Sequence, residues 1–190
     1  MSRIHWISPY SMSTPPNIGG AINDAIRQLN PADDDWLIHV DQDVLFLLPD
    51  TKRLIGEILA DTNFDVLGAT TNRLGTTYQL VPNTFKETDI LRHIKWAKTL
   101  QYSIGKKVEP TKEHLAAFLL CFRYSTFKQL GGFVENVLNF DTIFSIRAHK
   151  MKKKLGIMEG VYVFHLYRLN EAVDQSAADH YEHLLNGGRP

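Results

Sequence analysis

Hydrophobic and polar residues alternate in two rhythms along this chain. Apolar residues recur every three or four positions, which predicts helices, in stretches that begin near residues 18, 51, 88 and 142, with a shorter one after residue 125. Short apolar runs between them predict strands at residues 3–8, 36–40, 65–70, 115–123 and 160–167. Strands that alternate with helices are typical of an α/β domain, a sheet flanked by helices.

Local signals set the expected boundaries of these elements. Asp50, Ser125 and Asp141 each precede an apolar-periodic stretch, so each is expected to be a helix N-cap. The last of these helices is expected to continue to Leu155 and to end at Gly156. Irregular segments are predicted at residues 71–84 and 101–113, and a terminal helix at residues 170–185.

Composition narrows the class of protein. With 190 residues the chain has the size of a single domain, residues 1–190. Lys and Arg number 21, as do Asp and Glu, which argues against bulk attraction to nucleic acid. The single cysteine, Cys121, excludes an intramolecular disulfide and a cysteine-rich zinc site. The apolar runs are too short to span a membrane and the N-terminus lacks a signal-peptide pattern, so we expect a cytoplasmic protein without a transmembrane segment.

The sharpest local signal for chemistry is Asp41-Gln42-Asp43, directly after the apolar run at residues 36–40. In open α/β sheets, ligands bind outside the carboxyl ends of strands. Two carboxylates there repel each other unless they share a cation, so the motif favours a hard divalent metal. Such a metal would neutralise a diphosphate and stabilise it as a leaving group. A solvated turn at the end of a strand is the alternative interpretation.

Further motifs follow in order along the chain. They are Asn17-Ile18-Gly19 with Asn23, then Asp41-Gln42-Asp43, Gly131-Gly132-Phe133-Val134-Glu135, Asp141 with Arg147, and His165. This ordered set, over residues 3–168, resembles the GT-A fold glycosyltransferases, in particular the family 2-like enzymes with their Asp-x-Asp (DXD) motif. Residues 7–11, Ile-Ser-Pro-Tyr-Ser, look like the first strand of that family and the turn after it.

The resemblance implies a GT-A-type, Rossmann-like mixed sheet in a single domain, and a transferase that uses a nucleotide-diphosphate sugar, most simply a UDP- or GDP-sugar. The reaction would depend on Mn²⁺ or Mg²⁺. Asp43 would bind this metal, His165 would be a further ligand to the metal or the diphosphate, and Asp41 would bind the metal, a metal-bound water or the ribose. The residues implied in nucleotide-sugar binding are Pro9, Tyr10, Asn17, Asn23, Asp41, Gln42 and Asp43.

On the acceptor side, the resemblance assigns Asp141 as the general base of an inverting displacement, which takes the proton of an acceptor hydroxyl. Gly131 and Gly132 would let the acceptor approach the backbone, and Arg147 would pair with Asp141, Asp43 or a phosphate. The acceptor would be a saccharide, a lipid-linked group or another hydroxyl, with modified DNA as a minority interpretation. The short chain is compatible with a homodimer that completes its cleft.

Each of these residues also has a plain structural interpretation. Asp141 can be only a helix cap, Gly131-Gly132 only a helix end, His165 a strand histidine and Arg147 half of a surface ion pair. The sequence also departs from the family pattern twice. The first strand runs straight into the Asn-Gly helix without the usual β-α-β segment, and Phe140 stands where the family has a glutamate.

Two other functions stay open. A haloacid-dehalogenase-like phosphatase also places Asp-x-Asp after an apolar strand, and residues 67–72 mimic its second motif, although its late acidic pair is missing. A degenerate GT-A-like domain would bind a nucleotide or glycan without turnover. Weaker features are His180 with His183, which could share a metal, and the basic cluster of Lys150 with residues 152–154, for which a helix C-terminus is the simpler explanation.

Overall fold

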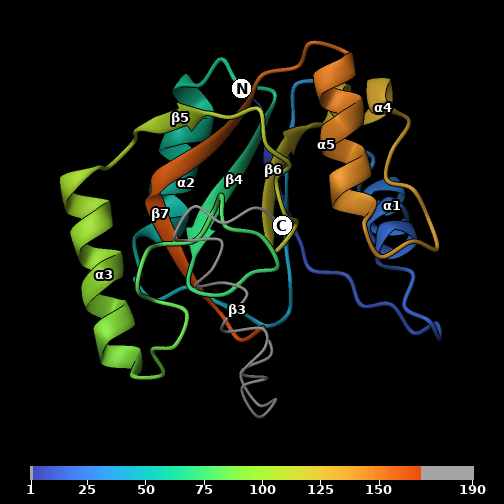
Figure 1. The fold of residues 1–190 in the computed structure, drawn as a ribbon. Coiled ribbons are helices and arrows are strands. Elements are labelled where there is room, and N and C mark those ends of the chain that lie inside the picture. The colour runs from blue at the N-terminus through green and yellow to red at the C-terminus, as the bar shows by residue number, and fades with distance from the viewer. Residues whose placement is uncertain (1, 168–190) are drawn as a thin grey trace.

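Strands form one mixed sheet at the centre of the computed structural model, which describes residues 2–167 (Figure 1). Their order across the sheet is β1-β2-β6-β4-β7-β3, and β5 pairs with β7 beside this path. Strands β1, β2, β4 and β7 run parallel to one another, and β3, β5 and β6 run antiparallel to them. The bounds are β1 (Ile4–Ile7), β2 (Trp36–Val40), β3 (Val44–Leu45), β4 (Val66–Thr71), β5 (Val108–Pro110), β6 (Leu119–Arg123) and β7 (Leu155–His165).

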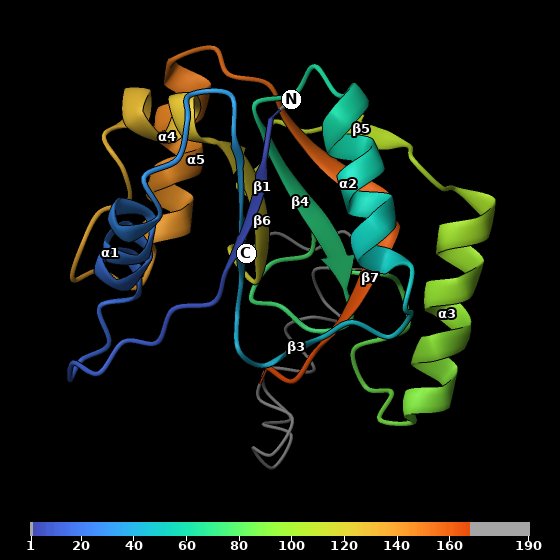
Figure 2. The same cartoon turned by 180° about the vertical axis from the view of Figure 1, so that it is seen from behind.

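Helices cover both faces of this sheet, as the two opposite views show (Figures 1 and 2). Helix α3 (Ile90–Ser103) packs along β7, where His93 is hydrogen-bonded to Tyr162. On one side of the sheet lies α2 (Thr51–Asp61). On the other side lie α1 (Ile18–Leu29), α4 (Tyr124–Leu130) and α5 (Phe140–Lys150). The prediction of an α/β fold with a mixed sheet flanked by helices is confirmed. In the described part of the chain, no helix is both long and apolar enough to cross a membrane.

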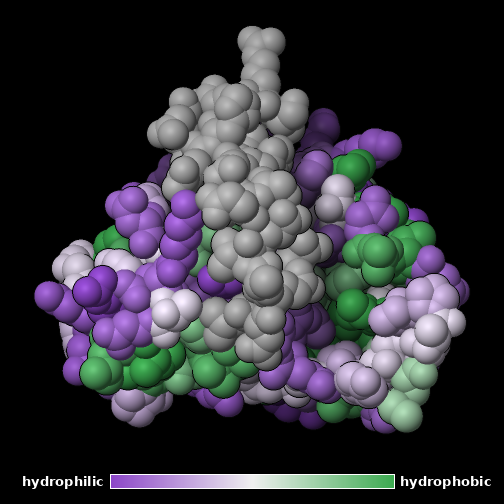
Figure 3. All heavy atoms as spheres, turned by 60° about the horizontal axis from the view of Figure 1, so that its bottom comes forward, coloured by the Kyte–Doolittle hydropathy of each residue, from purple (hydrophilic) through white to green (hydrophobic). Residues whose placement is uncertain are grey.

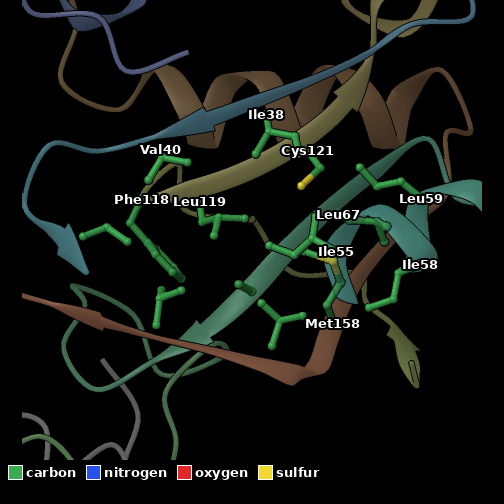
Figure 4. Packing of buried hydrophobic residues seen from close by; sticks show 14 of the residues in the cluster. Ile38, Val40, Ile55, Ile58, Leu59, Leu67, Phe118, Leu119, Cys121 and Met158 are labelled. Atoms are coloured by element: carbon green, nitrogen blue, oxygen red, sulfur yellow. The ribbon is translucent and has the colours of Figure 1, made fainter. Parts of the chain in front are cut away.

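Three hydrophobic clusters of the described residues hold these layers together, and the two larger ones lie on opposite faces of the sheet. On the α2 side, Leu67 and Cys121 from neighbouring strands pack against Ile55 of the helix (Figure 4). On the other side, Ile22 of α1 and Phe144 of α5 pack with the sheet. Complete burial raises the pKa of the Cys121 thiol, which keeps it protonated and unreactive.

Strand β7 is interrupted by a bulge half-way along its length. Ala69 of β4 pairs with Met158, whereas the next residue, Thr70, pairs with Tyr162. Residues 159–161 of β7 therefore have no partner on β4. A bulge of this kind bends the strand and changes the direction in which its later side chains point.

A close approach of two backbones accompanies this bulge. A Cβ atom on Gly160 would collide with the carbonyl oxygen of Gly105, so only glycine fits there. Beyond the bulge, β7 pairs with β3, where Val44 lies opposite His165. The second half of β7 places His165 at the edge of the sheet where the parallel strands have their carboxyl ends.

Two predicted helix caps are wrong, because each helix begins two residues earlier than the sequence pattern indicates. Helix α4 begins before Ser125, and the amide of Ser125 donates to the carbonyl of Asp33 at 3.1 Å. Helix α5 begins at Phe140, so Asp141 lies in its first turn and not at the cap. The third prediction holds only in position: Asp50 occupies the N-cap of α2 but makes no side-chain capping bond.

Strand boundaries also differ from the prediction. Helix α5 ends at Lys150, and β7 already begins at Leu155, which pairs with Val66 and is buried. The strand predicted at residues 115–123 is shorter and comprises β6 alone. Strands β3 and β5 were not predicted, because each is very short and gains its hydrogen bonds from β7. The predicted helix at residues 170–185, together with His180 and His183, lies outside the described residues.

Candidate metal and catalytic site

The parallel strands bring three predicted residues to one edge of the sheet. Asp41 and Asp43 follow the carboxyl end of β2, and His165 is the last residue of β7. In Figure 1 these strands end at the lower edge of the sheet. The backbone amide of Asp41 donates to the carbonyl of Phe118 at 2.9 Å, which fixes the turn after β2 against the chain that enters β6. This is the edge at which α/β sheets bind their ligands.

Asp41, Asp43 and His165 each offer one ligand atom, and these three atoms all lie within 4.8 Å of one another. His165 Nε2 lies 3.2 Å from Asp43 Oδ1. This hydrogen bond is the main reason why the pKa of Asp43 lies below its usual value, although burial opposes the effect. Because the amide of Leu166 donates to the carbonyl of Asp43 at 2.9 Å, the two segments are also joined through the backbone.

The imidazole of His165 is oriented by its surroundings. Its Nδ1 donates to the carbonyl of Arg73 at 2.9 Å, and its backbone amide donates to Asn72 Oδ1 at 2.7 Å. The ring stacks on Phe118 with centroids 5.5 Å apart. Because Nδ1 is held by Arg73, Nε2 is the nitrogen left to bind a metal, which would take the place of the proton shared with Asp43.

This donor set fits a divalent metal. Two carboxylates and one imidazole nitrogen are ligands that Mn²⁺ accepts, whereas Mg²⁺ and Ca²⁺ take oxygen ligands. The residues present therefore fit Mn²⁺ better than Mg²⁺. Asp41 and Asp43 are partly exposed, with side chains 34% and 45% accessible, so a cation can reach them from solvent.

A hollow of about 440 Å³ extends from this cluster, and Asp141 lies in its wall. The carboxylate of Asp141 accepts hydrogen bonds from the amides of Thr142, at 2.7 Å, and Ala117, at 3.2 Å. Burial raises the pKa of Asp141 against these two donors, and the charge of nearby Asp41 adds to the rise. A carboxylate with a raised pKa is a better proton acceptor near neutral pH.

The rest of the hollow is largely apolar. Leu74, Ala116, Phe118 and Leu138 belong to its lining, and Leu138 is 78% exposed. Among the described residues that line it there is no lysine or arginine. Figure 3 looks toward this end of the molecule, where apolar and polar side chains lie side by side on both flanks of the face.

Other predicted donor-binding residues lie apart from this cluster. Pro9, Tyr10 and Asn17 line a second hollow of about 480 Å³, beside α1 and the loop that precedes it. Asn17 Oδ1 also accepts from the amides of Gly20, at 3.0 Å, and Asn136, at 2.8 Å, so this side chain caps α1. Gln42 is exposed in the turn between its two aspartates and lines neither hollow.

Asn23 and the predicted acceptor loop form a structural unit away from both hollows. The side chain of Asn23 is hydrogen-bonded to both backbone groups of Phe133, at 2.9 and 3.0 Å. Arg147 donates to the carbonyls of Leu130 and Gly132, each at 3.3 Å. The structure thus brings Asn23, Gly132 and Arg147 together around the end of α4, where Gly131 is the left-handed C-cap.

Two residues of this site, His39 and Asn72, were not predicted from the sequence. His39 of β2 lies 2.9 Å from Asp41 through its Nε2 atom, and nothing in the spacing of an apolar strand indicates this. Asn72 holds the backbone of His165 from a segment predicted to be irregular. Thr71, offered by the phosphatase interpretation, is fully buried and donates to the carbonyl of Val163 at 3.1 Å, so its hydroxyl does not face the carboxylates' hollow.

No protein-family model and no curated protein matches this chain. What the site can do follows from its own groups: a place for one divalent cation, a nearby carboxylate able to accept a proton, and an open space of about 440 Å³ between them.

Proposed function

We propose that this chain is a GT-A-type glycosyltransferase that depends on a divalent metal, most suitably Mn²⁺, and uses a nucleotide-diphosphate sugar. The proposal rests on one observation: the candidate metal ligands and the candidate general base line the same hollow. Ligand atoms of Asp41, Asp43 and His165 lie within 4.8 Å of one another, and Asp141 lies in the wall of the same hollow. The order of motifs along the chain supports the same assignment.

Asp43 and His165, with Asp41, would hold the cation, which when bound would neutralise the diphosphate leaving group. His165 is well suited to this role because its ring is held by Arg73 and by stacking on Phe118. The absence of lysine and arginine from the described lining residues agrees with a reaction that needs the metal.

Asp141 would take the proton of the acceptor hydroxyl as its oxygen attacks the anomeric carbon. A carbon–oxygen bond forms to the acceptor, the bond from the anomeric carbon to the diphosphate oxygen breaks, and the diphosphate leaves with the electron pair. A single displacement of this kind inverts the anomeric configuration. Each carboxylate oxygen of Asp141 already accepts one backbone amide, which fixes the group while leaving lone pairs for the proton.

The first test is a thermal-shift titration of the purified full chain with UDP, GDP, TDP and CDP, each with and without Mn²⁺. Ligand at about 100 times its Kd should stabilise the chain by about 2.7 kcal/mol. We expect one nucleotide to raise Tm only with Mn²⁺, and the shift to be lost in Asp43→Asn. Asp61→Asn, at the exposed end of α2 and outside both hollows, is the control because it should keep the shift. No shift with any nucleotide would overturn the proposal.

The same nucleotide then decides between a transferase and a binding domain. Incubation with the matching sugar nucleotide and Mn²⁺ should release nucleoside diphosphate, slowly with water as acceptor and faster with a true acceptor. Binding without release under both conditions would support the degenerate domain instead.

A further inference from the structure

A buried histidine beside the site has no evident structural task. His39 lies on β2, between β1 and β6, and its side chain is only 1% exposed. Its Nε2 atom lies 2.9 Å from Asp41 Oδ1. Its Nδ1 atom is buried and has no hydrogen-bond partner among the described residues.

Another buried histidine of the chain shows what a structural role looks like. His93 of α3 uses both ring nitrogens, since Nδ1 bonds to the hydroxyl of Tyr162 at 2.6 Å and Nε2 to the carbonyl of Glu87 at 3.0 Å. It thereby ties α3 to β7 and to the preceding loop. His39 links no two elements in this way, because its single bond goes to a residue two positions ahead in the same segment.

An apolar side chain would pack at position 39 without leaving a buried nitrogen unpaired. Leu37, two residues earlier on the same strand, belongs to the core on the α1 and α5 side of the sheet, and side chains at positions 37 and 39 share that face. The unpaired Nδ1 of His39 costs stability, so we explain the presence of this histidine by its one hydrogen bond, which it makes to Asp41.

We propose that His39 is a positioning residue for the cation site: its Nε2–H holds one oxygen of Asp41 and leaves the other oxygen directed to the metal. This inference rests on the proposed function, and specifically on metal binding at Asp41, Asp43 and His165. The Nε2–H tautomer is required, because an unprotonated Nε2 would set its lone pair against those of the carboxylate.

The two histidines of the site then have different tasks. His165 would present Nε2 to the cation, which would take the place of the proton shared with Asp43, while Nδ1–H stays bound to the carbonyl of Arg73. His39 presents a protonated Nε2 to a carboxylate ligand. Outer hydrogen bonds of this type orient metal ligands, and their loss lowers metal affinity by about 10–100-fold.

The test measures Mn²⁺ affinity of the full chain by the electron paramagnetic resonance signal of free Mn²⁺. His39→Leu should bind Mn²⁺ about 10–100-fold more weakly than the wild type. His39→Gln should recover most of the affinity, because the glutamine amide nitrogen can take the place of Nε2. His39→Asn should not, because its amide is too short to reach Asp41.

His5→Leu is the matched control. His5 also contacts an aspartate through Nε2, Asp35 at 3.0 Å, but on β1 and at the other end of β2. This variant should bind Mn²⁺ as the wild type does.

Three outcomes would overturn the proposal in distinguishable ways. A folded His39→Leu chain with wild-type affinity would show that His39 positions nothing. If His39→Leu fails to fold, equal affinities of the glutamine and asparagine variants would show the same. A wild-type chain that binds no Mn²⁺ would overturn the cation site itself, and with it the proposed function.

Discussion

At each end of strand β2 an aspartate contacts a histidine, but the two aspartates differ in burial and in the number of hydrogen bonds that they accept. At the amino end, Asp35 is 1% exposed and accepts hydrogen bonds from His5, Arg3 and Ala32. At the carboxyl end, Asp41 is open to the hollow, and the described residues give it one side-chain partner, His39. A saturated carboxylate stabilises the fold, whereas one with free lone pairs can bind a ligand.

Electrostatics follows the same division. Hydrogen bonds, first from His5 and then from Arg3 and Ala32, hold the pKa of Asp35 far below its usual value despite burial. Asp141, in the candidate site, has a raised pKa because burial outweighs its two amide donors. The number of hydrogen bonds that each carboxylate accepts therefore distinguishes Asp35 from the acids of the candidate site, although all of them are aspartates.

The largest effect should come from the proton acceptor. Asp141→Asn should lower turnover of the sugar nucleotide by about 10²–10⁴-fold, because the amide cannot take the proton. Its Mn²⁺ affinity should stay near that of the wild type. Release of nucleoside diphosphate measures the first quantity, and the Mn²⁺ titration measures the second. Undiminished turnover would remove Asp141 from the mechanism.

A pair of substitutions at the two ends of β2 should separate binding from folding. Asp41→Asn should weaken Mn²⁺ binding by at least the ~10–100-fold that loss of an outer partner costs. Asp35→Asn should unfold at lower urea concentration and bind Mn²⁺ normally. Urea unfolding and Mn²⁺ titration of both variants give the four values. Equal losses of Mn²⁺ affinity in Asp41→Asn and Asp35→Asn would show that the two ends of β2 do not differ in metal binding.

A smaller loss of stability is expected from a substitution of Asn23, whose side chain, like that of Asp35, is hydrogen-bonded within the protein. Asn23→Ala should lower the free energy of unfolding by about 1–3 kcal/mol, because Phe133 loses partners for both backbone groups. The Mn²⁺-dependent nucleotide shift should persist, as it should in the surface control Asp61→Ala. Loss of the shift at unchanged stability would instead place Asn23 at the donor.

The smallest effect concerns pH. Because the pKa of Asp35 is lowered on folding, its contribution to stability is complete above its unfolded value of about 3.8 and is lost as the pH falls below that value. Asp35→Asn should therefore show a weaker loss of stability than the wild type as the pH falls toward 3. Urea midpoints measured at several pH values between 3 and 6 give this slope. The same pH dependence in the variant and in the wild type would contradict the inference that hydrogen bonds lower the pKa of Asp35 in the folded chain.

Much of the fold could be predicted, because local periodicity and burial agree over most elements. Residues 36–40 form the predicted strand and are buried throughout. The three residues of the candidate metal cluster could also be predicted, because two follow that strand and the third ends another strand of the same sheet.

The remaining features depend on contacts that the local sequence does not encode. Val44 and Leu45 form a strand only because His165 and Phe164 lie opposite them. The role of His39 depends on the turn that brings Asp41 back toward its ring. Asp141 is held by Ala117 from a distant segment, which the cap rule for helices cannot foresee.

The bulge in β7 divides that strand into two segments whose registers are set independently. Before it, Leu155 to Met158 are aligned by β4 and β5; after it, Tyr162 to His165 are aligned by the end of β4 and by β3. The position of His165 is therefore set by β3 and the end of β4, and it does not depend on the pairing of β7 with β5.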